Sequence, residues 1–539
     1  MDVIGTEVVQ SDDPRPSRMM PQLMRAGGAV DRYALPVYAL VIAAFSCIFV
    51  LAARLLTLEA DEAWVLLSTA RAFGVEFAAA GSLGAPTVTT GGPYLLLHGL
   101  LDAVTMNVFA HRAITLATTA ALLILVFRIL RAANYPPSVA MAGTALFTAT
   151  PGFVLQAGLA LGEVLATLLL IGGAAHWLHS GAKGVKAASM TGLLLGAACA
   201  TRVNCAAALP GLVAYAFLVQ RPTRQVLGRA LIAAGIAALV MWVSVRLYGA
   251  TGAVLPQAGQ DGYLAASTGF AKRKSITGMM QAIEVANQYM PIVLIVAIAA
   301  AWWAGRRDLQ AHTPAVILGF DLAGALLFIG AALFAAWVLV APIPHLRYLW
   351  PAVACIWLAG ILLLLFWWVR LETLASGLAL HGAVLAVCGF SLLTGWLTIT
   401  HGESLTLVYQ AMGASPRTAV VSAQFFRAAS DQRALAAFVA SRPPSARFFT
   451  FIPPVAYPIS YLANREISSR MPPVGQGERY FLMNPGDILV WRPGPEFDTW
   501  RRAHTVLAFK RGDFVAFRLA EGAPVPPTRY LPLGANDFF

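Results

Sequence analysis

The acidic pair Asp61-Glu62 has the residue types and the position to carry out chemistry at a membrane surface. It follows a long apolar run at 35–56. An ionised carboxylate beside hydrocarbon is costly, so acidic residues at the mouth of a membrane span are commonly tied to function. A carboxylate in this position could act as a general base, with Asp61 the first candidate and Glu62 the second. The alternative interpretation of the pair is an ordinary solvated loop.

Two later groups of basic residues are candidates for binding a phosphate. Arg347 lies beside Tyr348 in a short turn between apolar runs, and Lys272, Arg273 and Lys274 follow one another in a polar segment. Cations in these places would stabilise the charge of a phosphate group. The alternatives are an arginine that anchors a helix at the interface, for Arg347, and a solvated loop, for the basic run.

Charged and titratable residues also occur next to or inside the apolar runs. Glu163 either acts as a second acid or pairs with Arg202, and the sequence leaves both readings open. His176 and His179 have a spacing that suits a metal ion, but no carboxylate or cysteine joins them. We interpret these two histidines as interfacial side chains.

The composition of the chain is that of a polytopic membrane protein. Hydrophobic residues make up 58% of the sequence, charged residues 12%, and the mean hydropathy is +0.69. Nearly charge-free runs recur, each close to the ~20 residues that a helix needs to cross a bilayer. The sequence predicts a mainly α fold with about eleven membrane helices, near 35–56, 113–130, 136–153, 158–179, 187–201, 204–220, 230–248, 291–304, 314–340, 350–369 and 376–397. The segment from Pro93 to Phe109 carries His98 and Asp102, and we expect it to lie along the interface.

The distribution of basic residues predicts the orientation. Arginines and lysines cluster before the first run and in alternate connections, which the positive-inside rule places in the cytoplasm. The expected parts are a cytoplasmic tail at 1–34, a membrane domain at 35–398 with its first outer loop at 57–112, and an exported domain at 399–539. The net charge of +12 then reflects topology and anionic lipid, and needs no nucleic acid.

The segment after His401 predicts a small α/β domain. A helix is expected at 432–440 after Ser430-Asp431, a strand at 447–452, and a hairpin at 505–519. Neither a nucleophile motif nor a glycine-rich nucleotide loop occurs there, which argues against a nucleotide-dependent enzyme. The five cysteines all fall in apolar runs, so no disulfide is expected in this domain.

Several short motifs follow one another in a recognisable order. They are Ala60-Asp61-Glu62-Ala63, the proline-led segment at 92–97, Arg112 at the second run, Glu163 in the fourth, the runs at 192–196 and 200–202, Arg347-Tyr348-Leu349-Trp350-Pro351, and the segment at 457–465. In order and topology the chain resembles the GT-C polytopic glycosyltransferases, the class of protein O-mannosyltransferases and of lipid A aminoarabinose and galacturonate transferases. The resemblance covers most of the chain.

The resemblance implies an activity and its partners. Such enzymes move a sugar from a polyprenyl phosphate to a lipid, glycan or protein acceptor at the outer face of the bacterial inner membrane. It implies that the acidic residues Asp61, Glu62 and Glu163 are catalytic. It also implies that Arg347, Tyr348, Arg202 and the 272–274 run contact the donor phosphate. Many relatives carry a histidine before the proline where this chain has Gly91-Gly92-Pro93. No cofactor is therefore implied with certainty, and dependence on a divalent metal stays open.

Two other classes of protein fit a polytopic chain. A transporter or lipid flippase often shows internal repeats and charges at mid-membrane. No second copy of the first-half pattern is visible, and the acids lie at the mouth of a span. The third class is a non-catalytic scaffold for envelope assembly, which alanine at Asp61 would leave working.

Overall fold

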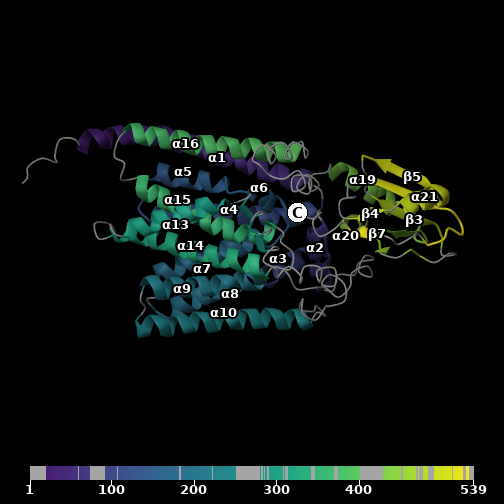
Figure 1. Ribbon diagram of the computed structural model, residues 1–539, viewed down its shortest axis with the longest axis horizontal. Helices are drawn as coiled ribbons and strands as arrows, with labels where there is room; N and C mark the ends of the chain where they lie inside the picture. Colours follow the sequence, from purple (N-terminus) through teal and green to yellow (C-terminus); the bar gives the residue numbers. More distant parts are fainter. Residues whose placement is uncertain are drawn as a thin grey trace, which may run out of the picture.

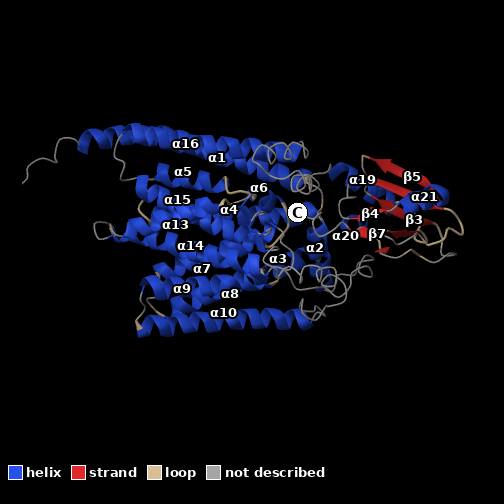
Figure 2. Ribbon diagram, in the orientation of Figure 1, coloured by secondary structure: helices blue, strands red, loops and turns tan. Residues whose placement is uncertain are grey.

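The protein is a long bundle of helices with a small mixed domain at one end (Figure 1). It is seen in a computed structural model that describes residues 20–56, 58, 60–72, 91–105, 107–180, 184–220, 223–250, 279–280, 283, 286–287, 290–306, 309, 313–340, 346–368, 374–400, 429–450, 453–468, 471–472, 477–483, 491–493, 495–512, 514–525 and 530–532. Strands gather in the C-terminal domain, as Figure 2 shows. The remaining described part is helical.

Helical structure occurs at each of the predicted apolar ranges. The helices of the bundle are α1 (Met20–Leu55), α4 (Val108–Ala132), α5 (Pro137–Thr148), α6 (Phe153–Gly158), α7 (Glu163–His179), α8 (Val185–Thr201), α9 (Ala208–Tyr215), α10 (Arg224–Ala250), α13 (Ile292–Gly305), α14 (Pro314–Val340), α15 (Leu346–Trp368) and α16 (Leu374–Thr400). A short 3₁₀ helix, η3 (Val203–Ala207), precedes α9, and a short π-helix, η4 (Ala216–Gln220), follows it. The expected run at 204–220 is therefore an irregular helix.

Six helices in the described part of the chain are long and apolar enough to cross a membrane. They contain Tyr33–Leu55, Val108–Ala132, Arg224–Ser244, Pro314–Leu339, Tyr348–Trp368 and Ala379–Leu397. Four shorter apolar helices accompany them, at Glu163–His179, Val185–Thr201, Val203–Val219 and Ile292–Gly305. The protein is therefore an integral membrane protein, and the number of eleven spans stays a prediction. The apolar segment of α15 is mostly buried, so α15 is the central helix of the bundle.

Two short helices cover the end of the bundle that faces the C-terminal domain. They are α2 (Ala60–Ala72) and α3 (Gly92–Asp102), both labelled in Figure 1. On α3 the polar residues His98 and Asp102 are buried, while Leu96, Leu97 and Leu100 are exposed. The polar face of this helix therefore points into the protein and its apolar face points outward.

The beginning of α3 requires glycine. Gly92 has φ +51°, a left-handed conformation that L side chains rarely adopt. A Cβ atom at this position would lie 2.8 Å from the Cβ of Ala200 near the end of α8. The N–H of Gly91 also donates to the carbonyl of Thr201 at 3.2 Å. The close approach of α3 to α8 thus explains why no larger residue stands before Pro93 in this chain.

The C-terminal domain is a mixed sheet covered by helices. Its elements are α19 (Ala429–Ala440), β1 (Arg447–Phe449), α20 (Pro453–Ala463), β2 (Ile467–Ser468), β3 (Arg479–Met483), β4 (Trp491–Pro493), α21 (Pro495–His504), β5 (Thr505–Arg511), β6 (Phe514–Leu519) and β7 (Tyr530–Pro532). The main sheet has the order β2-β1-β3-β6-β5, parallel around β1 and antiparallel from β3 onward, and β4 pairs with β7 separately. The predicted hairpin at 505–519 is β5 and β6. The predicted helix begins earlier, so Asp431 lies in its first turn instead of capping it.

Side-chain alternation along the strands builds a core on each face of this sheet. Phe448 and Tyr480 pack with α19 and α20 on one face. Phe449 and Phe481 pack with Phe497 of α21 on the other. Successive strand residues point to opposite faces, so one strand contributes to both cores.

The C-terminal domain is joined to the bundle through α2. Leu66 and Leu67 of α2 are buried against Tyr461 of α20. The side-chain amide of Gln432 makes two hydrogen bonds with Leu58, accepting from its N–H and donating to its carbonyl, both at 2.8 Å. The backbone just before Asp61 is therefore fixed by the C-terminal domain.

Candidate functional site

Glu62 is a buried ion-pair partner at the beginning of α2. The guanidinium of Arg112, at the beginning of α4, donates from Nε to Oε1 at 2.8 Å and from Nη2 to Oε2 at 2.6 Å. Its Nη1 donates to the carbonyls of Ala53 and Leu56, at the end of α1. The last carbonyls of a helix have no intrahelical partner, so Arg112 completes the end of α1 while it neutralises Glu62.

The same carboxylate holds the connection between α6 and α7. The N–H of Ala160 donates to Oε1 of Glu62 at 2.6 Å. The hydroxyl of Tyr94 on α3 donates to the carbonyl of Ala160. The backbone of Ala160 is thereby held at both its N–H and its carbonyl, three residues before Glu163. Glu62 consequently positions the start of α7, and both of its oxygens are occupied.

Glu163 and Arg202, which are buried, form a second cluster with the partly buried Tyr348. Nη2 of Arg202 donates to Oε1 of Glu163 at 2.5 Å, and both side chains are almost fully buried. The Arg202 guanidinium lies over the Tyr348 ring, 5.6 Å from its centroid. Asn204 donates from its amide to the carbonyl of Tyr348 at 2.9 Å. The sequence-based pairing of Glu163 with Arg202 is thus observed, and its contact with Tyr348 brings together three elements far apart in the chain.

Glu163 retains one oxygen for another partner. Its Oε2 is buried and receives no hydrogen bond from any residue that the structure describes. A buried carboxylate oxygen without a donor is costly, because water is excluded there. The position of this oxygen beside a cation and an aromatic ring suits a polar ligand group that donates to it.

A third polar network lies behind the ion pair of Glu62. Oδ1 of Asp102 is 2.9 Å from Nε2 of His111, and Nδ1 of His111 is 3.0 Å from Nδ1 of His98. Thr69 Oγ1 of α2 lies 3.0 Å from Oδ2 of Asp102, and the Tyr94 ring stacks on His98. The network joins α2, α3 and α4. Burial, and next the neighbouring His111, lowers the pKa of His98 well below its ordinary value.

The sequence interpretation missed His111. Its signal was the pairing of His98 and Asp102 four residues apart, which places both on one face of a helix. A polar face with two such groups needs partners when it is buried. His111 directly precedes Arg112, the residue that the motif order had singled out. The two residues lie near the start of α4 and belong to the two adjacent networks.

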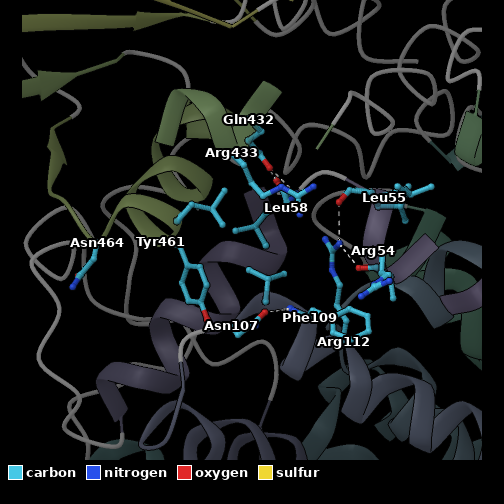
Figure 3. A pocket seen from close by; sticks show the side chains of 14 residues that line it. Arg54, Leu55, Leu58, Asn107, Phe109, Arg112, Gln432, Arg433, Tyr461 and Asn464 are labelled. Carbon is cyan, nitrogen blue, oxygen red and sulfur yellow. Dashed lines mark hydrogen bonds between the residues drawn. The ribbon is translucent and has the colours of Figure 1, made fainter. Parts of the chain in front are cut away.

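A cavity of about 700 Å³ opens where α1 and α4 meet the C-terminal domain (Figure 3). Arg54 of α1 and Arg433 of α19 both line it, and Arg112 forms part of its wall. Arg54 lies over the ring of Phe109, 5.3 Å from the centroid. The other lining residues are Ala53, Leu55, Leu56, Leu58, Asn107, Val108, Gln432, Tyr461, Leu462 and Asn464.

Several predicted site residues lie wholly or partly outside the described residues. Asp61 is in the first turn of α2, next to Glu62, but its side chain is not described. Arg347 is in the first turn of α15, and its side chain is likewise not described. The run at 272–274 lies outside the described residues altogether. Their roles stay predictions.

No group of three histidine, cysteine, aspartate or glutamate side chains within the described residues has the arrangement of a metal site. His98, His111 and Asp102 are close together, but the carboxylate lies on the opposite ring nitrogen of His111 from His98. Three ligands of one ion must point at a common centre about 2 Å from each. These three groups are therefore a linear polar chain, with an ion-pair contact between Asp102 and His111 and a hydrogen bond between His111 and His98.

No protein-family model matches the chain, and no curated protein matches its sequence. Solved structures do match its fold. ArnT from Cupriavidus metallidurans bound to undecaprenyl phosphate aligns with a TM-score of 0.50 and 11% identity, over 91% of this chain and 99% of that one. The same protein in its apo state aligns with a TM-score of 0.52 and 12% identity, over 89% of this chain and 97% of that one.

The alignment spans both the bundle and the C-terminal domain, since it covers nearly all of each chain. At such low identity the likeness concerns the course of the chain. The described helices and the mixed C-terminal sheet are thus arranged as in ArnT, which is the GT-C fold that the order of the sequence motifs predicts.

Proposed function

We propose that this protein is a membrane glycosyltransferase that moves a sugar from a polyprenyl-phosphate donor to an acceptor at the outer face of the membrane. The observation that carries the proposal is the buried ion pair of Glu163 and Arg202 beside Tyr348, in a chain with the fold of ArnT. A solved ArnT structure holds undecaprenyl phosphate. A buried guanidinium beside an aromatic ring suits a phosphate that leaves with a growing negative charge.

In the proposed reaction the acceptor hydroxyl attacks the anomeric carbon of the sugar. The bond between this carbon and the phosphate oxygen breaks, and polyprenyl phosphate leaves. The proton of the hydroxyl passes to a carboxylate acting as general base. Asp61 is our candidate for the base. Its neighbour Glu62 has both oxygens engaged by Arg112 and the Ala160 N–H, which suits a positioning role.

In our proposal the donor phosphate is bound by Arg202 and Arg347, beside Tyr348. Arg202 and Tyr348 lie together, and Arg347 directly precedes Tyr348 in α15. Glu163 orients Arg202, and its second oxygen faces the sugar or the acceptor in our proposal. The run Lys272-Arg273-Lys274 adds positive charge if the predicted topology places it on the outer face. That topology has the N-terminus in the cytoplasm and the C-terminal domain outside.

The test is transfer by the purified full-length protein in detergent, with a panel of polyprenyl-phosphate sugars and envelope lipid extract as acceptor. Release of polyprenyl phosphate and the mass of the product are measured by mass spectrometry. We expect Asp61→Asn to lower the rate by ~10²–10⁴-fold, the loss typical of a missing general base. The matched control is Asp498→Asn, which alters a half-exposed aspartate of α21.

The outcomes separate the three classes of protein. Transfer that is lost in Asp61→Asn and kept in Asp498→Asn supports the enzyme. Full activity in both variants removes Asp61 from the mechanism. Movement of the lipid-linked sugar across a proteoliposome bilayer, with no bond broken by the native protein, would establish a flippase instead.

A further inference from the structure

The cavity between α1, α4 and the C-terminal domain is unusual in its charge. Among the residues that the structure describes, its lining includes three arginines, Arg54, Arg112 and Arg433, and no aspartate or glutamate. The charge of Arg112 is matched by the carboxylate of Glu62 through two hydrogen bonds. Within the described part of the chain, no ion pair involves Arg54 or Arg433. The cavity therefore carries two positive charges that no described residue of its wall neutralises.

Neutral hydrogen-bonding groups accompany these charges. Asn107 uses its carbonyl oxygen to accept from the N–H of Phe109, which leaves its amide NH₂ to donate. Asn464 and Tyr461 also line the cavity. Such a set of donors suits an anion with several acceptor oxygens, as a phosphate has.

The rest of the wall is apolar and lies at the end of a membrane span. Leu55 and Leu56 mark the end of α1, whose segment Tyr33–Leu55 is long and apolar enough to cross the bilayer. Val108 and Phe109 begin α4, another such helix. Arginines at this depth meet lipid headgroups, while the leucines and Phe109 meet the start of the acyl chains. The occupant that fits both halves of the wall is an amphiphile with an anionic head.

We propose that this cavity is a binding site for the phosphate headgroup of an anionic membrane lipid, with Arg54 and Arg433 holding the phosphate. The site is separate from the proposed donor centre, because Glu163, Arg202 and Tyr348 do not line the cavity. Arg54 belongs to the bundle and Arg433 to the C-terminal domain, so a bound phosphate bridges the two parts. Arg433 directly follows Gln432, whose amide already fixes Leu58.

The experiment is native mass spectrometry of the full-length protein in detergent, titrated with phosphatidylglycerol or with zwitterionic phosphatidylcholine. We expect the native protein to bind phosphatidylglycerol in preference. The variant Arg54→Gln/Arg433→Gln is expected to lose at least about tenfold in affinity for it, since each charge-assisted hydrogen bond to phosphate is worth roughly that factor. Glutamine keeps a long polar side chain and removes the charge. The control is Arg502→Gln, an exposed arginine of α21 outside the cavity.

Thermal unfolding provides a second readout on the same samples. Phosphatidylglycerol should raise the unfolding temperature of the native protein and of Arg502→Gln, and should leave that of the double variant unchanged.

Equal binding of the two lipids, or native affinity in the double variant, overturns the proposal. Inorganic phosphate alone is added in a separate arm, and a stabilisation equal to that of phosphatidylglycerol also overturns it, because the acyl chains would then contribute nothing. A double variant with the native unfolding temperature in the absence of lipid shows that folding is intact; if it is lower, the single variants are titrated instead.

Discussion

The carboxylate of Glu62 and the guanidinium of Arg112 face each other in a two-point ion pair that is almost fully buried. All three nitrogens of the guanidinium donate hydrogen bonds. Nε and Nη2 donate to Glu62, and Nη1 donates to two carbonyls at the end of α1. A buried pair is stable under such conditions because few polar atoms lack partners. The pair ties α1, α2 and α4 together immediately beside Asp61. In our proposal the pair positions Asp61, the candidate base.

Glu62→Gln is expected to destabilise the protein by about 3–5 kcal/mol, because it leaves Arg112 as an uncompensated buried charge. The measurement is the unfolding temperature in detergent. The double variant Glu62→Gln/Arg112→Gln should recover part of the loss, since no buried charge remains. Glu521→Gln, at an exposed position, is the control. A Glu62→Gln protein that unfolds like the native one but transfers no sugar would point to Glu62 as the base.

The helices were predictable from the sequence because lipid imposes a single requirement on every span. Backbone groups must be satisfied within the segment, so apolar runs of sufficient length read as helices. The order of motifs also predicted the fold, and the hairpin at 505–519 followed from alternation around Gly512. The irregular segment at Val203–Gln220 was not predictable in this way, since its composition is that of any apolar helix.

The partners within the site were harder to predict. Glu62 and Arg112 are 50 residues apart, and Gln432 and Leu58 are 374 apart. Such pairings depend on how helices pack, which composition and periodicity do not specify. The segment that carries His98 and Asp102 was expected to lie along the interface, and the inward direction of these two side chains was not predicted. They face inward, where His111 and Thr69 supply hydrogen bonds to them.

Gly92→Ala is expected to lower stability by about 1–2 kcal/mol from the left-handed backbone alone. The clash with Ala200 adds to this loss. The variant Gly92→Ala/Ala200→Gly should therefore recover the part that comes from the clash and keep the part that comes from φ. Unfolding temperatures are compared with Gly228→Ala, a helical position where a Cβ meets no atom within 4 Å. A native unfolding temperature in Gly92→Ala would mean that α3 begins differently in solution.

The stability of the protein should decrease as the pH falls below about 6.5, the ordinary pKa of histidine. The pKa of His98 is lowered in the folded state, so below this pH the unfolded chain binds a proton that the folded protein does not. The loss continues down to the folded pKa, with a slope of up to about 1.4 kcal/mol per pH unit. His98→Asn should flatten this dependence between pH 7.5 and 5.5, whereas His179→Asn, at the exposed end of α7, should keep it. An unchanged pH profile in His98→Asn would assign the effect to other groups.

Gln432→Leu is expected to loosen the C-terminal domain from the bundle. The change leaves the N–H and the carbonyl of Leu58 without the side-chain amide that now binds both, at a buried position. Each buried backbone group that loses its partner costs about 1–3 kcal/mol. Gln432→Glu should have a smaller effect, because a carboxylate still accepts from the Leu58 N–H but cannot donate to its carbonyl.

Ser430→Leu, at an exposed position of α19, controls for the added apolar side chain. Limited proteolysis measures the rate at which the C-terminal domain is released. If Gln432→Leu and Ser430→Leu are cleaved at the native rate, the apolar contact of Tyr461 with α2 is sufficient to hold the domain, and the Gln432 amide is not needed to fix the segment before Asp61.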